Sequence, residues 1–509
     1  MIKNLNSKGK VIIAGAGPGD TGLITVKALG YVRKCDVILY DKLANPELLS
    51  ECQENCEKIF VGKEAGLHHV SQDNTISILI EKAKEGKLVL RLKGGDPLIF
   101  GRGSEEAMAM KQAGIEFEII PGITAGAAVS SYAGIPLTHR SLVAQTIFVT
   151  AHESPDKPET QVEWELLAKM KNTVLVIYMG ATMLPKIAGT LIGFGMDKDT
   201  NIALIENGTL PQQRTFISRL CEVKDDIIKY SIKPPVITLI GPTIAFRDEL
   251  KWFENKPLFG KRIVATRAAD QANSLYEKLR DLGAIVIPFK VIKTKLTSDI
   301  QNLRELFSLN NYEWLIFSSE NGVRYFFSAL ESQGLDSRIL NNLKIAVIGS
   351  GTASKLNTYF LKPDFVPTKF TSEDFVYDFT NQFKLKGEKI LRIKGDFEND
   401  IIRDGLEKAG VDVDSFVVYD LMNDKPDENV KEDLRNNGAD AFTFTSSSTV
   451  NNFFTILGEV TAKNLLLSSK VFAIGPVTEK SLKEHGIVNV FVADIHTLDG
   501  LIEKVICNI

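Results

Sequence analysis

The chain has 509 residues, of which 44% are hydrophobic and 24% are charged. These shares are normal for a globular protein, and the length predicts three or four domains. The net charge of −4 argues against a nucleic-acid-binding protein held by a broadly basic surface. The five cysteines form neither a disulfide nor a zinc pattern, and no stretch is long and apolar enough to cross a membrane. We therefore expect a cytoplasmic protein with reduced thiols and without nucleic-acid or membrane partners.

The first predicted unit, Lys10 to Leu29, consists of a strand, a glycine loop and a helix. Gly15 and Gly17 match the first two glycines of a dinucleotide-binding fingerprint, but Asp20 stands where the third belongs. Pro18 stiffens the loop and removes an amide that a pyrophosphate would use. NAD is therefore disfavoured, and a neutral or cationic nucleoside ligand suits the loop better.

The second predicted strand, within Cys35 to Leu49, ends at Asp41. A carboxylate there binds a ribose, acts as a base or caps a turn. Lys63 stands in another glycine-flanked turn, and His68 and His69 follow it. Adjacent side chains do not converge on a helix or a strand, so we expect no metal site at this histidine pair.

The chain is organised around LVLRLKGGDPLIFGRGSEEA, residues 88–107. An apolar run predicts a buried strand, which ends at Gly94, Gly95 and Asp96. The glycines admit backbone angles that a side chain forbids, and they let a ligand lie against the main chain. Ser104 is expected to cap the helix that follows. The turn is therefore either a ligand shelf at the carboxyl end of a strand or an ordinary tight turn.

The next segment, Ala113 to Leu142, predicts a strand, the turn PGIT and a helix rich in small residues. Small residues allow the close approach of a ligand, or simply tight helix packing. His139 and Arg140 follow an Ile-Pro break and are expected in a loop, where they meet carboxylates or are solvated. Three further strands are expected, one ending before Met179 and one at an Asn-Gly turn.

Eight motifs occur in one order between Lys10 and Phe246: GAGPGD, YDKL, VGKEAG, LKGGDPLIFGRG, PGITA, GIPLTHR, YMG and NGT. This order and spacing resemble uroporphyrinogen-III C-methyltransferase, a family of S-adenosylmethionine-dependent tetrapyrrole methylases. The resemblance implies two α/β domains with the active site in the cleft between them. It also implies two methylations of uroporphyrinogen III, which give precorrin-2. Ser104 and Ala151 depart from the family pattern, and both changes are conservative in size.

The same resemblance implies the site residues. The adenosylmethionine site would be lined by Pro18, Gly94, Gly95, Asp96, Ile99, Thr124, Ala125, Met179 and Gly208. Asp41 matches the family's proposed proton acceptor and Lys63 its proposed proton donor; methylation of the macrocycle requires a ring proton to leave, which gives a carboxylate a task. The acceptor carries eight carboxylates, so we expect local basic residues to capture it. The candidates are Arg91, Lys93, Arg102, His139 and Arg140.

The segment 248–260 is charged and aromatic, and its Pro257 and Gly260 predict a linker. The remainder contains an internal repeat of about 127 positions. The matched pairs are RIVATR with KILRIK, WLIFSSENGVRYFF with AFTFTSSSTVNNFF, KIAVIGSGT with KVFAIGPVT, and TSEDF with TLDGL. Each copy reads strand, helix, strand, helix, which predicts two small parallel-sheet domains.

This second half resembles uroporphyrinogen-III synthase from about Lys261 onward, through IVATR, FSSENGVRYF, IGSGT, VVYDL, FTSSSTVNNF and IGPVT. The resemblance implies two interleaved lobes: lobe one, about 261–292 plus 421–509, and lobe two, about 295–418. Tyr419 matches a tyrosine that assists loss of water, and Thr478 matches the threonine of the IGPxT turn. Two serine-rich turns precede predicted helices and contain Ser318, Ser319, Ser446 and Ser447. Their hydroxyls either bind anionic groups or cap the helices. Neither a nucleophile nor a metal is expected, since catalysis would consist mostly of holding a reactive chain in a folded pose.

Together the two resemblances predict a bifunctional α/β enzyme, with a methyltransferase at 1–247 and a synthase at 261–509. It would cyclise hydroxymethylbilane with inversion of the last ring, and then methylate the product with S-adenosylmethionine and without a metal. The methylase family also implies a homodimer through the N-terminal half. Two alternatives remain open: a methylase of a different acceptor, and a C-terminal half that binds tetrapyrroles without catalysis. The end product would be either sirohaem or cobalamin.

Overall fold

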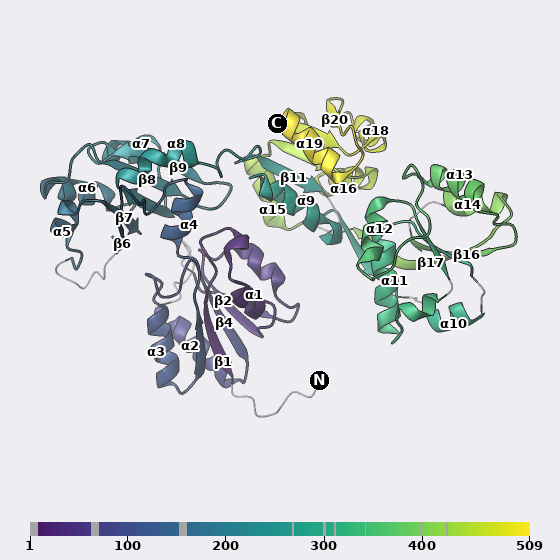
Figure 1. The fold of residues 1–509 in the computed structure, drawn as a ribbon, viewed down its shortest axis with the longest axis horizontal. Helices are drawn as coiled ribbons and strands as arrows, with labels where there is room; N and C mark the ends of the chain where they lie inside the picture. The colour runs from purple at the N-terminus through teal and green to yellow at the C-terminus, as the bar shows by residue number, and fades with distance from the viewer. Residues whose placement is uncertain are drawn as a thin grey trace. The chain divides into compact units, whose positions relative to one another are not determined.

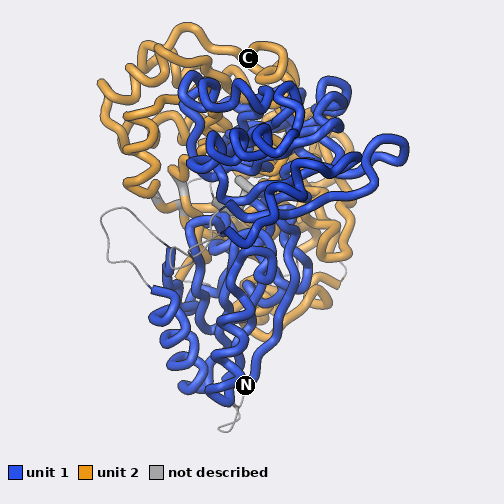
Figure 2. The backbone as a smooth tube through the Cα atoms, turned by 90° about the vertical axis from the view of Figure 1, so that its left-hand side faces the viewer, with its two compact units in different colours: residues 1–261, 280–285 blue, residues 262–279, 286–509 orange. Residues whose placement is uncertain are grey.

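The computed structural model describes residues 9–62, 71–151, 160–266, 269–298, 302–309, 312–341, 343–396, 400–423 and 426–509. Within them the chain forms four five-stranded sheets with helices packed on them (Figure 1). The chain divides into two compact units, coloured separately in Figure 2. The first unit comprises residues 1–261 and 280–285, and the second comprises residues 262–279 and 286–509. The predicted α/β fold class is confirmed.

The first sheet of the first unit is entirely parallel, with the strand order β3-β2-β4-β1-β5. Its elements are β1 (Lys10–Gly15), η1 (Thr21–Leu23), α1 (Val26–Val32), β2 (Val37–Tyr40), η2 (Pro46–Glu51), β3 (Glu57–Phe60), α2 (Gln72–Lys84), β4 (Leu88–Lys93), α3 (Gly103–Gln112) and β5 (Glu116–Ile120). Alternate residues of β1 enter different cores: Ile12 packs on one face of the sheet and Val11 and Ile13 on the other. A parallel sheet covered on both faces reads as the continuous apolar runs seen in β1 and β4.

The second sheet is mixed, with the order β6-β7-β10-β8-β9; β6 and β7 are parallel and the other pairs are antiparallel. Its elements are α4 (Ala125–Tyr132), β6 (Gln145–Thr150), α5 (Trp164–Lys169), β7 (Thr173–Tyr178), α6 (Leu184–Gly193), β8 (Asn201–Glu206), β9 (Arg214–Arg219), α7 (Val223–Lys229), β10 (Val236–Ile240), η3 (Pro242–Phe246) and α8 (Arg247–Leu250). The polar stretch after the Asn-Gly turn contains β9, which pairs with β8 as a hairpin.

The segment expected as a linker, 248–260, is packed against the first unit. The Phe253 side chain is buried, and its ring lies 4.7 Å from the ring of Tyr132 in α4. Leu258 is buried as well, and the Arg247 guanidinium pairs with the Glu254 carboxylate at 2.5 Å. The segment is therefore part of a core rather than a free tether.

The second unit contains two sheets that share the order of four of their five strands. The third sheet has the order β12-β11-β18-β19-β20 and the fourth has the order β13-β17-β16-β14-β15. The elements of the fourth are β13 (Ile292–Leu296), α10 (Leu303–Leu309), β14 (Trp314–Phe317), α11 (Glu320–Ser332), η4 (Ser337–Leu340), β15 (Lys344–Val347), α12 (Ser350–Asn357), α13 (Ser372–Gln382), β16 (Lys389–Gly395), α14 (Ile401–Lys408) and β17 (Asp412–Asn423). The elements of the third are β11 (Arg262–Thr266), α9 (Ala269–Asp281), β12 (Ile285–Pro288), α15 (Glu428–Asn437), β18 (Ala441–Phe444), α16 (Ser447–Leu457), α17 (Glu459–Leu467), β19 (Lys470–Ala473), α18 (Pro476–Glu484), β20 (Val490–Val492) and α19 (Leu498–Asn508).

The internal repeat read from the sequence is confirmed by these strand orders. The neighbours β11, β18 and β19 of one sheet correspond in sequence and position to β16, β14 and β15 of the other, and all of these neighbours run parallel. The fourth sheet adds one antiparallel strand, β13, which pairs with β17. The chain therefore enters the third sheet, completes the whole fourth sheet and then returns to the third.

Candidate active site

Four glycines bring the loops after β1, β4 and β5 into backbone contact. Gly17 and Gly95 form an antiparallel bridge, in which the Gly95 amide donates to the Gly17 carbonyl at 2.7 Å. A Cβ atom on Gly15 would lie 2.4 Å from the Gly95 carbonyl oxygen, and one on Gly122 would lie 2.2 Å from the same oxygen. Side chains at Gly15 and Gly122 would therefore separate these loops.

Asp96 fixes the turn that contains Gly95. Its Oδ1 accepts the Leu98 amide at 2.8 Å and the Ile99 amide at 3.2 Å, and its Oδ2 accepts the Gly122 amide at 3.0 Å. One carboxylate thus links the turn after β4 to the turn after β5. The expected strand at this position is confirmed as β4. The helix begins two residues earlier than expected, so Ser104 does not cap it but lies in the first turn of α3, and Arg102, in a left-handed conformation, precedes the helix.

The turn at Gly95 faces the start of α4. Gly95 has φ +67°, and a Cβ there would lie in ordinary contact, 3.6 Å from the Ala125 nitrogen and 3.9 Å from the Thr124 Cα. The Thr124 hydroxyl lies 2.6 Å from the Tyr178 hydroxyl, and Tyr178 also accepts the Gly126 amide at 2.7 Å. Tyr178 ends β7, so this contact joins the two sheets of the unit and places Met179 in the adjoining loop.

The Asn-Gly turn after β8 meets the loop that contains Pro18. Gly208 packs against α4, where an added Cβ would lie 2.4 Å from Val129. The Thr209 hydroxyl accepts the Asp20 amide at 3.1 Å. Left-handed non-glycine residues gather in these loops: Phe100, Arg102, Met179, Asn207 and Thr209. Such conformations concentrate at functional sites. Eight of the nine residues expected to line the adenosylmethionine site are therefore in loops that contact one another or α4, and the ninth, Ala125, begins α4.

A chain of charges runs from Asp41 into the interior. The Asp41 Oδ2 lies 3.3 Å from the Arg91 guanidinium, while its Oδ1 accepts the Leu43 amide at 3.1 Å. Arg91 and Lys93 then share the Glu106 Oε1, at 3.2 and 3.0 Å. Arg91 and Lys93 are each 5% exposed and Glu106 is 0% exposed. Burial lowers the pKa of Lys93, against the opposing effect of Glu106.

The expectation that Arg91 and Lys93 belong to a basic surface is corrected by this burial, because both cations are already paired with an interior carboxylate. Arg102 is exposed and pairs with Glu105 at 2.6 Å. Arg140 is exposed, and the His139 ring packs at 4.7 Å on the ring of Phe246. Lys63, the predicted proton donor, lies outside the described residues.

In the second unit, the predicted residues fall into two groups. In the fourth sheet, the buried Tyr419 hydroxyl lies 3.2 Å from the Ser319 hydroxyl, and the Tyr419 ring stacks on Tyr325 at 5.3 Å. Ser319 caps α11 by accepting the Gly322 amide at 3.1 Å, and the Ser318 hydroxyl donates to the Ile393 carbonyl at 3.2 Å.

The other group lies beside the third sheet. Ser446 caps α16 in a reciprocal capping box with Thr449. The Ser447 hydroxyl donates to the Val477 carbonyl at 3.0 Å, which places it beside Thr478, a buried residue in the first turn of α18. Capping, one of the two open interpretations, is thus observed at Ser319 and Ser446.

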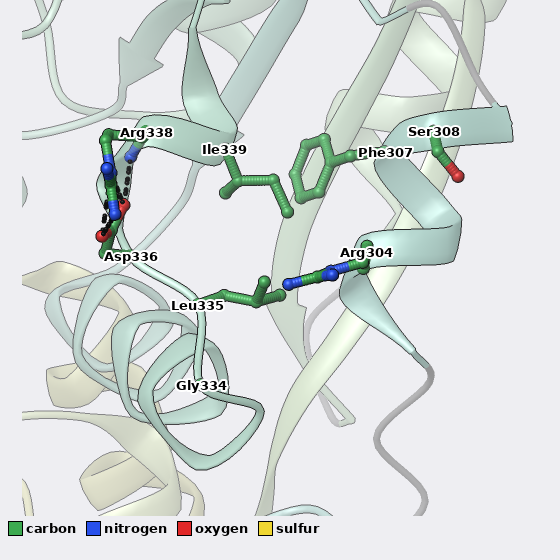
Figure 3. A pocket seen from close by; sticks show the side chains of 8 residues that line it. All are labelled: Arg304, Phe307, Ser308, Gly334, Leu335, Asp336, Arg338 and Ile339. Carbon is green, nitrogen blue, oxygen red and sulfur yellow. Dashed lines mark hydrogen bonds and ion pairs between the residues drawn. The ribbon is translucent and has the colours of Figure 1, made fainter.

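A hollow of about 470 Å³ lies elsewhere in the second unit, beside α10 and η4 (Figure 3). Its lining residues are Arg304, Phe307, Ser308, Gly334, Leu335, Asp336, Arg338 and Ile339. The sequence-predicted site residues are all absent from this lining. Among the residues that the structure describes, no helix combines the length and apolar composition that crossing a bilayer requires.

Sequence reasoning missed Glu106 and Tyr178, which hold the predicted residues in place. The signal for Glu106 was the spacing of Arg91 and Lys93, since side chains two apart on a strand share a face and need one common partner when buried. No comparable signal marked Tyr178, because its partners lie more than fifty positions earlier in the chain.

Known proteins match the chain in two parts. The family model for tetrapyrrole (corrin/porphyrin) methylases matches residues 10–224, and the model for uroporphyrinogen-III synthase HemD matches residues 273–503. The porphyrin biosynthesis protein HemD of Ruminiclostridium josui is 34% identical over 506 residues, 98% of each chain. The uroporphyrinogen-III C-methyltransferase of Bacillus subtilis is 39% identical over 333 residues, 65% of this chain and 68% of that protein.

Among solved structures, the native uroporphyrin-III C-methyltransferase of Thermus thermophilus is 32% identical and covers 47% of this chain and 99% of its own, with a TM-score of 0.40. The two family models match the two parts of the chain, and the Ruminiclostridium josui relative extends over both. The chain belongs to the tetrapyrrole methylase family through its N-terminal part and to the uroporphyrinogen-III synthase family through its C-terminal part, and it is a bifunctional enzyme of tetrapyrrole biosynthesis.

Proposed function

We propose that the second unit cyclises hydroxymethylbilane to uroporphyrinogen III, with inversion of the last ring, and that the first unit methylates this product twice to precorrin-2. The observation that carries the proposal is the contact of the loops after β1, β4, β5, β7 and β8 in the first unit, centred on Gly95. In the second unit the supporting observation is the pair of hydroxyls on Tyr419 and Ser319, 3.2 Å apart. The end product is sirohaem or cobalamin, both of which use precorrin-2.

The residues around Gly95 fit S-adenosylmethionine as the methyl donor. When bound, this group supplies an electrophilic methyl on a positively charged sulfur, and the chain needs no phosphate-binding loop to hold it. The space beside Gly95, bounded by Ala125 and Thr124, accepts atoms at van der Waals distance. The residues that would hold the donor are Pro18, Gly94, Gly95, Asp96, Ile99, Thr124, Ala125, Met179 and Gly208.

Asp41 is the base that this proposal assigns. Its side chain is 25% exposed, so it is open to a substrate, and its Oδ2 lies 3.3 Å from the Arg91 guanidinium, which holds it in place. A proton must leave the macrocycle after each methyl transfer, which gives the carboxylate its task. Lys63 is proposed as the proton donor, and the exposed Arg102 and Arg140, with His139, as contacts for the acceptor's carboxylates.

In the second unit, Tyr419 is proposed to assist loss of water from the bilane, with Ser319 holding its hydroxyl. Thr478 and the hydroxyls of Ser318, Ser446 and Ser447 are proposed contacts for the bilane's carboxylates. Catalysis then consists mainly of holding the flexible chain in the pose that closes the ring. Neither step requires a metal in this proposal.

The proposal also covers organisation: a methyltransferase at 1–247, a joining segment at 248–260 and a synthase at 261–509, acting as a homodimer in the cytoplasm. The first compact unit ends its main segment at Lys261, which supports the boundary. Analytical ultracentrifugation of the purified chain tests the proposed homodimer. A monomer at all protein concentrations would refute it.

The test supplies the full chain with hydroxymethylbilane and labelled S-adenosylmethionine and identifies the tetrapyrrole formed. The expected product is precorrin-2, and without the methyl donor it is uroporphyrinogen III. Formation of only the uninverted isomer would leave the C-terminal half as a tetrapyrrole-binding lobe. Inverted product without methylation, together with methylation of a later precorrin, would assign a different acceptor.

A further inference from the structure

Three of the five cysteines meet in the first unit, in a place unrelated to the glycine loops. Cys35 follows α1, Cys52 ends η2, and Cys56 directly precedes β3. Their Sγ atoms all lie within 4.8 Å of one another, and those of Cys35 and Cys56 are 3.7 Å apart. Three thiols from three different elements thus converge on one point.

The surroundings of the thiols combine an apolar wall with one open side. Cys35 and Cys56 are 1% and 8% exposed and belong to a core cluster that includes Val32 and Leu48. Cys52 is only half-buried, so water reaches the cluster from its side. Burial raises the pKa of Cys35, and burial next to Cys56 raises the pKa of Cys52 to about 11.

The spacing of the sulfur atoms suits a tetrahedral cation. Zinc binds thiolate sulfur at about 2.3 Å, which sets two sulfurs of one tetrahedron about 3.8 Å apart. The Cys35–Cys56 separation of 3.7 Å agrees with that edge. The third sulfur, of the half-buried Cys52, lies within 4.8 Å of both, so a rotamer change of this one side chain would bring it to the same distance and leave a fourth position for water.

We propose that Cys35, Cys52 and Cys56 form a thiolate site for a thiophilic cation of the zinc type. Binding forms three metal–sulfur bonds and releases three thiol protons to solvent, so zinc and three thiolates carry one net negative charge. Lys58 lies close enough to Cys52 to interact with it electrostatically, and its positive charge would offset the negative charge of the zinc–thiolate group. The site is independent of the proposed function.

The position of the site makes it structural. Cys35 lies two residues before β2 and Cys56 one residue before β3, so both sit at the amino ends of parallel strands. The glycine loops follow the carboxyl ends of strands in the same sheet. A cation here would tie α1, η2 and β3 together at the amino ends of the strands, and binding to the folded chain would stabilise the fold.

The test titrates reduced, chelator-stripped full-length protein with zinc(II) against a chromophoric chelator, and counts the protons released in weak buffer. We expect one tightly bound zinc, about three protons released and a higher unfolding temperature. Cadmium(II) should add a sulfur-to-metal absorption band. Binding should weaken by at least about tenfold in Cys52→Ser, a change at the half-buried position that the fold tolerates.

The matched control is the double variant Cys221→Ser/Cys507→Ser, which removes the two exposed cysteines and should bind zinc like the native chain. Weakened binding in this control would overturn the proposal. So would unchanged binding in Cys52→Ser, release of fewer than two protons, or a Cys35–Cys56 disulfide that forms in the presence of excess zinc.

Discussion

Two strand ends in this protein have almost the same sequence, LRLKGGD at 90–96 in the first unit and LRIKGD at 391–396 in the second. In each, a buried arginine and a buried lysine share one carboxylate oxygen. Arg91 and Lys93 share the Glu106 carboxylate, whereas Lys394 lies 2.9 Å and Arg392 3.5 Å from the Asp400 Oδ1.

The two segments differ in the partner and in the glycines. The Glu106 side chain is completely buried, while the Asp400 side chain is 38% exposed. The first segment has one glycine more, and that residue, Gly95, is left-handed and bonded to Gly17. The same strand end therefore leads into the glycine turn proposed for the methyl donor in one unit and into a bond to Tyr419 in the other, where the Asp396 amide donates to the Tyr419 carbonyl at 3.1 Å. The extra glycine, Gly95, and the complete burial of the Glu106 carboxylate are thus the two features that separate the first strand end from the second.

The largest expected effect comes from Gly95→Asp. The change adds bulk and negative charge where the backbone would meet the methyl donor, so adenosylmethionine binding should be lost. Calorimetry measures the binding, and product analysis should still find uroporphyrinogen III. Gly114→Asp is the matched control, because Gly114 has nearly the same φ, +68°, and open space around it. Normal binding by folded Gly95→Asp would refute the placement of the donor.

Glu106→Gln tests the buried carboxylate directly. Loss of its charge removes the carboxylate that the buried Lys93 and Arg91 share and leaves Arg91 with its Asp41 pair, so unfolding of the first unit should become easier by about 3–5 kcal/mol. Asp400→Asn, the counterpart in the second segment, should cost only about 1 kcal/mol or less because its side chain meets water. Hydrogen exchange of peptides from β4 and β16 measures both, and equal effects would remove the distinction between the segments.

Asp41→Asn probes the outer end of the charge chain in the first segment. The amide keeps the shape but cannot accept the ring proton, so methylation should slow by about a hundredfold or more while adenosylmethionine binds normally. Single-turnover kinetics measure the step. Asp36→Asn, at the other end of β2, controls for loss of a carboxylate; wild-type turnover in Asp41→Asn would leave Asp41 as a turn cap.

Tyr419→Phe removes the hydroxyl beside Ser319. The second unit should lose about 1 kcal/mol of stability, the usual worth of one hydrogen bond, and cyclisation of hydroxymethylbilane should slow. The control is Tyr312→Phe, which loses a bond of 2.7 Å to Asp414 in the same unit. Equal cyclisation rates in the two variants would make Tyr419 purely structural.

The smallest effect concerns capture of the acceptor. With Arg91 and Lys93 buried in the first segment, only exposed residues attract carboxylates from solution, so Arg140→Ala should raise the Michaelis constant for uroporphyrinogen III by up to about fivefold. The effect should fade with salt, since screening acts over about 10 Å at 0.1 M. Arg338→Ala in the second unit is the control, and an effect independent of salt would count against electrostatic capture.

Much of the architecture follows from local pattern. The apolar run ending at Gly94 predicted β4, and the repeat predicted matching strands in two sheets, even to the threonines Thr371 and Thr497, which both cap helices. The burial of Arg91 could not be predicted from local pattern. Its burial depends on Glu106, fifteen positions later on a helix, and on Asp41, fifty positions earlier.

The thiol cluster shows the same limit. Cys52 and Cys56 read as a weak pair because the third member, Cys35, joins them only when β2 and β3 lie side by side. The hairpin of β8 and β9 was missed because Arg214–Arg219 is polar, and a strand with one solvated face is hard to separate from a loop.

The return of the chain to the third sheet has a consequence during synthesis. β11 pairs with β18, and the Thr443 hydroxyl bonds a carbonyl of β11 that lies 179 positions earlier. At about 5–20 residues per second, the ribosome takes on the order of ten to forty seconds to produce that partner. The strands of the fourth sheet emerge within this interval and are complete first. During this interval, the edge of β11 that later pairs with β18 has no partner strand. Nascent chains of this enzyme should therefore depend on chaperones most strongly between the synthesis of β11 and that of β18.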